Sequence, residues 1–341
     1  MRILATGFTS AHTGRQQALN IQGLAPILQN HLKGDHDFTC SVLTPEVYDQ
    51  LNSYDLVLTG IADISSIFAC YSIHTMVVLN ECRRRGIPVL AYVDDWQFYK
   101  YVKSFQRFGG GIYLDRIMRV MLPIKGSLDV STNEFIPKIR ETIGWLGRGD
   151  WPLTLICLFP WGSVEHASSM MGLSADRLVH VDPSSKLQKF DIPQAPDIER
   201  ERKWILASLF DHSAWTKKLG LQWDVDVYGH RRSHAPRLAE TELAKVYGYT
   251  WGVLSPYYKP AAVGWWRNRY VYATRAGAIL GVDHELMPPG FTAVAPKDIE
   301  RMSLADLIQY RDTQNKALKF WPEEQFDAVV DGAIKQSMRG W

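Results

Sequence analysis

Residues 263–283, with the sequence VGWWRNRYVYATRAGAILGVD, decide how the fold of this chain is interpreted. Trp266, Tyr270 and Ala273 recur at helical spacing, so the first part of the stretch predicts a helix. Gly277 is placed to end that helix, because glycine adopts the left-handed conformation that often follows a last helical turn. The stretch therefore predicts a helix that stops sharply before the next element.

Strands are expected on both sides of this helix. Residues 278–280 read as a short buried strand, and residues 252–256 read as a strand that runs into a loop. Strand, polar loop, helix and strand form the repeating unit of a parallel α/β sheet. Arg267 and Arg269 fall in the first turns of the helix, where the helix dipole and their charge suit a diphosphate. A surface helix with two solvated arginines would show the same pattern.

The composition is that of an ordinary folded protein. The 341 residues suffice for two domains of roughly 150–200 residues each. The net charge of +2 excludes a basic field over the whole molecule, so nucleic-acid binding would require a local patch. The four cysteines form no CxxC pair, which predicts reduced thiols. We see no signal peptide and no apolar run of membrane-spanning length, so we expect a cytoplasmic protein without a membrane partner.

The first half of the chain predicts a parallel sheet covered on both faces. Strands are expected at residues 2–6, 38–43, 55–59, 87–92, 153–159 and 178–181, and helices at 15–32, 71–85, 137–145 and 164–171. Residues 7–14 (GFTSAHTG) form a polar loop between strand and helix, a common cradle for phosphate or sugar, which makes Gly14 and Arg15 candidate donor contacts. Arg83, Arg84 and Arg85 are expected to form a solvated helix end.

Two acidic residues follow the fourth strand, at the edge of a parallel sheet where ligands bind. Asp94 is our candidate general base, with Asp95 as its orienting partner or as a helix cap. Residues 96–107 alternate aromatic and basic side chains, which suits a nucleic-acid surface but equally a helix with an aromatic core stripe. The candidate acceptor contacts are Trp96, Tyr99, Lys100, Lys103 and Arg107.

The second half predicts a smaller α/β unit. Residues 186–200 contain two prolines and no periodicity, which is typical of an interdomain linker. Strands are expected at 204–209, 223–228 and 249–254, and helices at 214–219, 241–246, 304–318 and 323–338. We therefore expect one domain at residues 1–190, a second at 191–322 and a last helix at 323–341.

The order of these segments resembles that of the phage DNA glucosyltransferases that modify 5-hydroxymethylcytosine. The segments that carry the resemblance are residues 54–65 (YDLVLTGIADIS), 88–98, 153–183, 219–229 (LGLQWDVDVYG) and 266–283. The resemblance implies an α/β fold of two facing Rossmann-like domains (GT-B type), with a cleft between them and a C-terminal helix that crosses back to the first domain. It also implies sugar transfer from a nucleotide sugar such as a UDP-sugar to a modified base of double-stranded DNA, flipped out of the duplex.

Several site residues are carried over from this resemblance by position. Asp94 matches the family's catalytic aspartate, and Arg269 matches its phosphate-binding arginine. Where the family places a glutamate on the ribose hydroxyls, this chain has Tyr272, which leaves a different donor open. The loop after the first strand of the second domain keeps Ser208 but lacks glycine. The other expected donor contacts are Lys217 and Lys218, in place of that loop's arginines, with Gly229, His230 and Arg267.

Such a site needs no resident cofactor, because the nucleotide sugar is a co-substrate and arginine stabilises the departing diphosphate in place of a metal ion. We expect a monomer. Two other functions fit the same pattern: a GT-B glycosyltransferase or sugar-nucleotide epimerase with a non-DNA acceptor, and a non-catalytic nucleic-acid-binding protein that has kept the fold. Binding of a nucleotide sugar separates the enzymes from the third function, and salt-dependent binding of duplex DNA separates the first function from the second.

Overall fold

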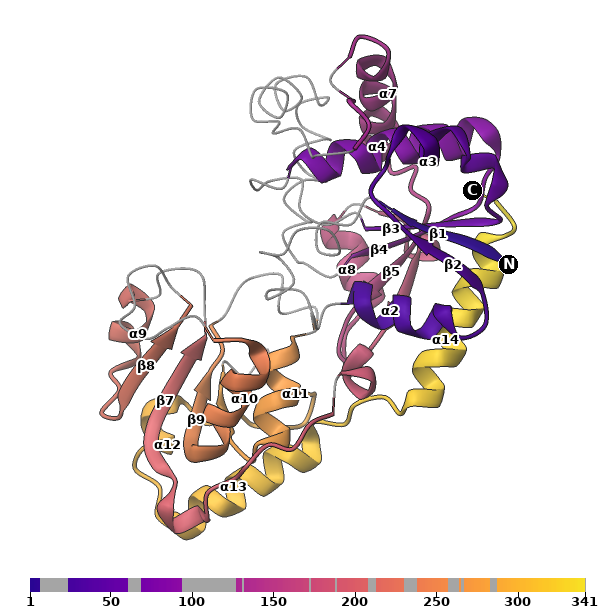
Figure 1. Ribbon diagram of the computed structural model, residues 1–341. Helices are drawn as coiled ribbons and strands as arrows, with labels where there is room; N and C mark the ends of the chain where they lie inside the picture. The colour runs from indigo at the N-terminus through magenta and orange to yellow at the C-terminus, as the bar shows by residue number, and fades with distance from the viewer. Residues whose placement is uncertain are drawn as a thin grey trace. The chain divides into compact units, whose positions relative to one another are not determined.

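The chain forms two compact α/β units in the computed structural model (Figure 1). Unit 1 comprises Met1–Lys186 and Trp321–Trp341, and unit 2 comprises Leu187–Phe320. The structure describes residues 1–6, 24–60, 69–93, 127–130, 132–171, 173–187, 189–207, 213–229, 238–256, 264, 267–282 and 287–340, called the described residues below.

Unit 1 is built on a six-stranded parallel sheet with the strand order β2-β1-β3-β4-β5-β6. Its strands are β1 (Arg2–Thr6), β2 (Asp37–Cys40), β3 (Leu56–Gly60), β4 (Val89–Val93), β5 (Leu153–Cys157) and β6 (Leu178–Val181). All residues of β3, β4 and β5 are buried, as expected for apolar strands with helices on both faces. Because all pairings are parallel, the carboxyl ends of the six strands lie along one edge.

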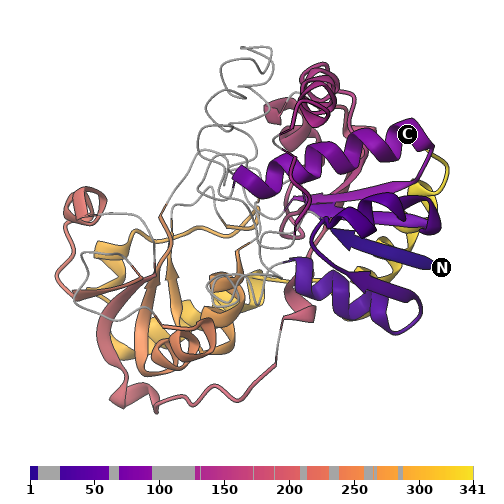
Figure 2. The same cartoon turned by 45° about the horizontal axis from the view of Figure 1, so that its top comes forward.

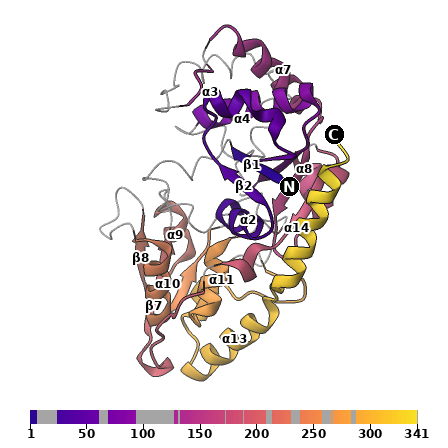
Figure 3. The same cartoon turned by 45° about the vertical axis from the view of Figure 1, so that its right-hand side comes forward.

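Helices cover both faces of this sheet. They are α2 (Leu24–Lys33), α3 (Pro45–Asp49), α4 (Ala69–Arg85), α7 (Phe135–Gly147), α8 (Val164–Met171) and α14 (Glu323–Ser337). The pair α4 and α7 packs together above the sheet, and α2 lies below it (Figure 2). The helix α14 packs against β4, β5 and β6, although the whole of unit 2 precedes it in the sequence (Figure 3). His31 of α2 connects this helix to α14, through Asp327 at 2.9 Å and Asp331 at 3.0 Å.

One buried carboxylate ties together both chain connections that leave unit 1. Asp182 follows β6 and is fully buried. Its Oδ1 accepts hydrogen bonds from the backbone N–H of Ser184 at 3.1 Å and from the hydroxyl of the same residue. Its Oδ2 accepts the backbone N–H of Trp321 at 2.9 Å. Because the chain leaves unit 1 after Lys186 and returns at Trp321, Asp182 holds the outgoing and the returning segment. Burial raises the pKa of Asp182 to about 6, although these hydrogen bonds oppose the shift.

Unit 2 has a four-stranded parallel sheet with the order β10-β9-β7-β8. Its strands are β7 (Glu201–Ala207), β8 (Asp224–Tyr228), β9 (Thr250–Leu254) and β10 (Ile279–Gly281), and its helices are α9 (Ser213–Leu219), α10 (Glu240–Tyr249), α11 (Asn268–Arg275), α12 (Pro296–Ile299) and α13 (Leu304–Ala317). Gln314 of α13 bonds the backbone N–H and C=O of Leu280, at 2.8 and 3.1 Å. The side chain thereby satisfies the outer edge of β10, which would otherwise be open to pairing.

Two details of unit 2 differ from the sequence expectations. The helix α11 begins at Asn268, and Arg267 is its extended N-cap residue, so Trp266 lies before the helix. Residues 189–200, expected to be a linker, belong to unit 2: the backbone N–H of Ala195 donates to the carbonyl of Gly248 at 3.0 Å, and Arg200 donates to the carbonyl of Thr250 at 3.1 Å. Apart from the 3₁₀ turn Asp197–Glu199 the stretch is irregular, so the sequence shows no periodicity there.

No helix of the part that the structure describes is long and apolar enough to cross a membrane. Among the described cysteines, Cys40, Cys82 and Cys157 are free thiols.

Candidate functional site

Each sheet has one place where the strand order reverses, and open α/β sheets bind ligands there, at the carboxyl ends of the strands. In unit 1 the reversal lies between β1 and β3, and in unit 2 it lies between β7 and β9. These two edges, each within its own unit, are the candidate binding sites.

The edge of unit 2 is organised by Arg267. Its Nη1 donates to the Oγ of Ser255 at 2.8 Å and to the carbonyl of Pro256 at 3.0 Å. Ser255 directly follows β9 and is fully buried. Since Arg267 is also the N-cap residue of α11, these bonds fix the start of that helix beside the carboxyl end of β9.

Arg269 lies in the first turn of α11, with a half-buried side chain. It makes no hydrogen bond or ion pair with any other described residue. The first N–H groups of a helix have no partner within the helix, and the helix dipole gives this end a partial positive charge. A helix start fixed in place, with an uncommitted guanidinium beside it, can hold a phosphate or diphosphate group.

The other described donor candidates have varied surroundings. Lys217 and Lys218 are exposed in the last turn of α9, toward the amino ends of the strands if the helix runs back along the sheet as crossover helices do. Gly229 follows β8 with φ at 90°, a conformation that favours glycine. Tyr272 is only 2% exposed, and its ring packs 5.6 Å from that of Phe190. Their roles in donor binding stay predictions.

The remaining sequence candidates lie outside the described residues and stay predictions as well. They are Gly14, Arg15, Asp94, Asp95, Trp96, Tyr99, Lys100, Lys103, Arg107, Ser208 and His230. Because β4 ends at Val93, Asp94 is the next residue of the chain after that strand.

The edge of unit 1 carries two buried hydroxyl groups that the sequence did not single out. Thr6 and Thr59 are register partners on β1 and β3, on either side of the strand reversal. Both are fully buried, and neither hydroxyl has a hydrogen-bond partner within the described ranges. Such a group costs about 1–3 kcal/mol when left unpaired. Their sequence signal is absent, because a threonine in an apolar strand looks like any β-branched core residue.

A third polar group of this kind lies in the turn after β5. The indole Nε1 of Trp161 has no exposed surface and no hydrogen-bond partner in the described part of the chain. The ring of Trp161 stacks on Phe159, with 4.6 Å between centroids and 14° between planes. The carboxyl edge of unit 1 therefore combines unpaired polar atoms with a stacked aromatic pair.

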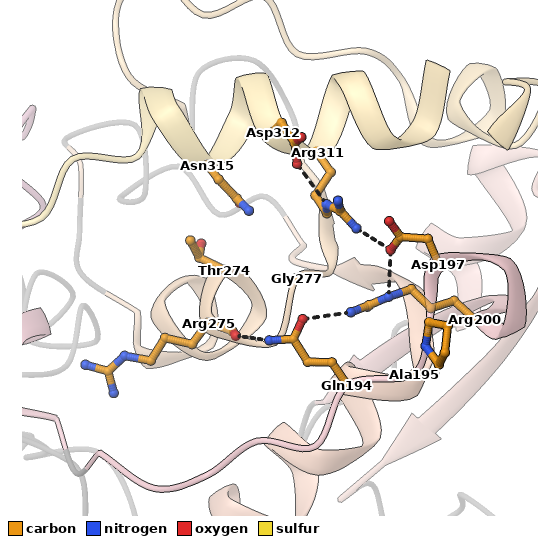
Figure 4. Close-up of a pocket in the computed structure, with 11 residues that line it drawn as sticks. Gln194, Ala195, Asp197, Arg200, Thr274, Arg275, Gly277, Arg311, Asp312 and Asn315 are labelled. Carbon is orange, nitrogen blue, oxygen red and sulfur yellow. Dashed lines mark hydrogen bonds and ion pairs between the residues drawn. The ribbon is translucent and has the colours of Figure 1, made fainter. Parts of the chain in front are cut away.

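A polar pocket of about 480 Å³ lies on the other side of unit 2, next to Arg200 and Gly277, which precede β7 and β10 in the chain (Figure 4). Segment 194–200, the end of α11 and the helix α13 line it. Asp197 lies between two guanidinium groups, at 3.4 Å from Nε of Arg200 and 2.5 Å from Nη1 of Arg311. Arg200 also donates to the carbonyl of Ala276 at 2.9 Å, and Gln194 donates to that of Arg275 at 3.0 Å.

These contacts give the pocket a structural role. The last carbonyl groups of a helix lack partners within the helix, and here Arg200 and Gln194 supply them at the end of α11. Burial lowers the pKa of Arg200, while the charge of Asp197 opposes this. Because its charged groups pair with one another and with the helix end, we do not place the reaction in this pocket.

No group of three or more His, Cys, Asp or Glu side chains that could hold a metal ion occurs among the residues that the structure describes. The acidic pair of β8 does not form such a group, since Asp226 pairs with Lys203 at 3.1 Å.

No protein-family model and no curated protein sequence matches this chain. The solved structures that resemble it over nearly its whole length include the following two. One is the DNA modifying enzyme β-glucosyltransferase, determined with and without uridine diphosphoglucose, at a TM-score of 0.51 and 8% identity, covering 99% of this chain and 98% of the other. The second is the T4 phage enzyme in complex with UDP and Mn²⁺, at a TM-score of 0.51 and 9% identity, with the same coverage. At such identities the likeness shows the fold, and the chain therefore has the GT-B type α/β fold that its sequence predicts.

Proposed function

We propose that this protein is a glycosyltransferase that moves a sugar from a nucleotide sugar, first of all a UDP-sugar, to the hydroxyl of a modified base in double-stranded DNA. The fold supports the proposal, because it is the fold of a DNA-modifying enzyme whose substrate is uridine diphosphoglucose. Two parallel sheets with separate ligand edges suit a reaction with two substrates.

The observation that carries the proposal is the pair of arginines at the start of α11. Arg267 is bound to Ser255 and Pro256 and positions the helix, whereas Arg269 has no partner among the described residues. A guanidinium at the positive end of a helix dipole matches the oxygens of a diphosphate.

The chemistry then follows from the charges that the reaction creates. The acceptor oxygen forms a bond to the anomeric carbon, and the bond from that carbon to the diphosphate breaks. Arg269 and the positive end of the α11 dipole stabilise the negative charge of the departing diphosphate. The hydroxyl proton passes to a carboxylate base, for which we propose Asp94, with Asp95 orienting it or capping the next element. Arg269 supplies positive charge that a metal ion would otherwise supply, so we expect transfer without added metal.

The test is mass spectrometry of nucleosides from a duplex that contains 5-hydroxymethylcytosine, after incubation with the protein and a panel of nucleotide sugars. We expect the modified nucleoside to gain the mass of one sugar, with at least one donor and also in the presence of EDTA. The same duplex with unmodified cytosine is the control, because it offers no hydroxymethyl group.

Two other outcomes would each point to a different function. UDP binding without a mass gain on the duplex would favour a glycosyltransferase or epimerase with a non-DNA acceptor. Binding of the duplex without any binding of UDP or of nucleotide sugars would favour a non-catalytic nucleic-acid-binding protein.

A further inference from the structure

The turn between β5 and α8 is held rigidly at the carboxyl edge of unit 1 (Figure 1). At its start, the backbone N–H of Leu158 donates to the carbonyl of Val181 at 3.0 Å, and Nε2 of His180 donates to the carbonyl of Leu158 at 3.2 Å. The turn itself closes where the N–H of Gly162 donates to the carbonyl of Phe159 at 2.7 Å. These bonds come from the neighbouring strand β6 and from the turn, so they fix the path of the backbone.

At the other end of the turn, Ser163 is the N-cap residue of α8. Its Oγ accepts the backbone N–H of His166 at 3.0 Å, which satisfies one of the free donors at the start of the helix. The same hydroxyl donates to Glu165 at 3.1 Å. The helix start is therefore already capped and carries an acid, which disfavours a phosphate at this place.

The aromatic side chain of this turn that keeps an exposed surface is Trp161. Its ring lies almost parallel to that of Phe159, which is only 2% exposed and anchors the pair in the core. Trp161 itself is half-buried, so part of its ring is open to solvent, whereas its indole N–H is buried and lacks a hydrogen-bond partner in the described ranges. A preoriented apolar ring with an exposed part suits the face of a flat, uncharged group.

We propose that the exposed part of the Trp161 ring is the stacking platform for the acceptor base. This inference rests on the proposed function and adds the residue of unit 1 that binds the face of the acceptor base. A tryptophan ring binds any base through its face, so this platform holds the base without selecting among bases.

The experiment compares Trp161→Ala and Trp161→Phe with the unchanged protein, on a duplex that contains 5-hydroxymethylcytosine. We expect Trp161→Ala to raise the KM for the duplex about tenfold, which corresponds to about 1.4 kcal/mol. Trp161→Phe keeps a smaller ring to stack on, so we expect a smaller rise, about threefold. The affinity for UDP, measured by calorimetry, should stay within about twofold in both variants.

The control variant is Tyr249→Ala, which removes an aromatic ring of unit 2 that is 48% exposed, at the end of α10. It should leave the KM for the duplex unchanged. Thermal unfolding reports whether each variant is folded. If Trp161→Ala does not fold, the KM of Trp161→Phe tests the platform.

Three results would overturn the platform. The first is a KM within twofold of the unchanged protein in both Trp161 variants, with normal transfer, which leaves the proposed function standing. The second is a loss of UDP affinity as large as the rise in KM, which would place the base of the donor on Trp161. The third is an unchanged protein that neither binds nor glycosylates the duplex, which removes the proposed function and this platform with it.

Discussion

Arg267 and Arg269 are two positions apart in the chain and have different surroundings. The guanidinium of Arg267 is bound to Ser255 and Pro256, so it belongs to the framework of unit 2. Arg269 has no bond to any other described residue, so its charge is available to a ligand. Single substitutions should therefore separate stability from donor binding.

We expect Arg269→Ala to weaken UDP binding by about 1.5–3 kcal/mol, the range for a hydrogen bond to a charged group, and to leave stability unchanged. Arg267→Ala should instead lower the free energy of unfolding by about 1–3 kcal/mol, because it removes two bonds at the start of α11. Calorimetry with UDP and urea unfolding measure the two effects. Arg301→Ala, whose side chain is 67% exposed, is the control. Unchanged UDP affinity in Arg269→Ala would move the phosphate site elsewhere, with Lys217 and Lys218 as the next candidates.

Asp94→Ala tests the general base. The proposed reaction needs a carboxylate to take the hydroxyl proton, so transfer should fall to background while UDP binding remains. Steady-state transfer to the hydroxymethylated duplex is the measurement, and Asp95→Ala should lose less activity. Turnover within tenfold of the unchanged protein, about 1.4 kcal/mol of barrier, would exclude Asp94 as the base.

Asp182 should make the stability of unit 1 depend on pH. Burial raises the pKa of its carboxyl group from 3.8 to about 6, so the folded state binds the proton more tightly than the unfolded chain. The stabilisation is complete below pH 3.8 and is lost as the pH rises through 6, with a total of about 3 kcal/mol. Asp182→Asn cannot titrate, so its unfolding free energy should fall less between pH 4 and pH 7 than that of the unchanged protein. The same fall in the unfolding free energy between pH 4 and pH 7 in both proteins, measured by urea unfolding, would contradict this prediction.

At the scale of the residue, the sequence predicted correctly the positions that follow from local spacing along a strand or helix. It placed Gly277 at the end of α11 and Arg269 in its first turn, as the structure does. It missed the unpaired hydroxyls of Thr6 and Thr59, because their proximity comes from the strand register and has no local signal.

Among the elements, the bounds of β1, β6 and α8 agree with the sequence expectation, since each is a short run with clear local periodicity. The end of α4 differs. Arg85, expected to be solvated, is only 15% exposed and binds the fully buried carboxylate of Glu81 at 2.9 Å, and Lys138 of α7 joins it at 2.8 Å. Arg84 also binds Glu81, at 2.7 Å, but stays 64% exposed, as expected. Burial alone would raise the pKa of Glu81, yet these three cations hold it at about 2. A partner on a distant helix cannot be inferred from the spacing of the arginines.

The end of α11 offers a prediction at the scale of the element. Gly277 has φ at 68°, and a Cβ atom there would lie 2.9 Å from both Nη2 of Arg200 and Oε1 of Gln194. We expect Gly277→Ala to cost about 1–3 kcal/mol in urea unfolding, through backbone strain and the displaced side chains. Gly332→Ala, inside α14 with no atom within 4 Å of the added Cβ, is the matched control and should stabilise the protein slightly. Equal effects of the two substitutions would mean that the helix end carries no strain.

At the scale of the whole molecule, the order of segments was enough to predict two parallel sheets of the GT-B type. The acceptor contacts expected from the sequence, at residues 96–107, stay predictions, because those residues lie outside the part that the structure describes. The sequence also gave no sign of the tie at Asp182, which depends on a backbone N–H from the far end of the chain.

The noncontiguous makeup of unit 1 can be tested through Phe326. This residue of α14 is fully buried, and its ring centroid lies 6.2 Å from that of His31, with the two rings nearly perpendicular. We expect Phe326→Ala to cost about 3–5 kcal/mol and to raise hydrogen exchange in β4, β5 and β6, while β7 and β9 of unit 2 keep their protection. Met338→Ala, at an exposed position just after the same helix, is the control. Equal loss of protection in both units would show that they unfold as one.

During translation, the sheet of unit 1 is complete before one of its covering helices has been made. The ribosome makes all six strands of unit 1 before it reaches Leu187, but the helix that covers β4, β5 and β6 is made only after Phe320. Unit 2 is contiguous and can fold in the interval, as domains do during synthesis. During that time the apolar surface under α14 stays open to solvent, to chaperones and to neighbouring nascent chains. The slowest and most aggregation-prone stage of biogenesis should therefore be the wait for α14.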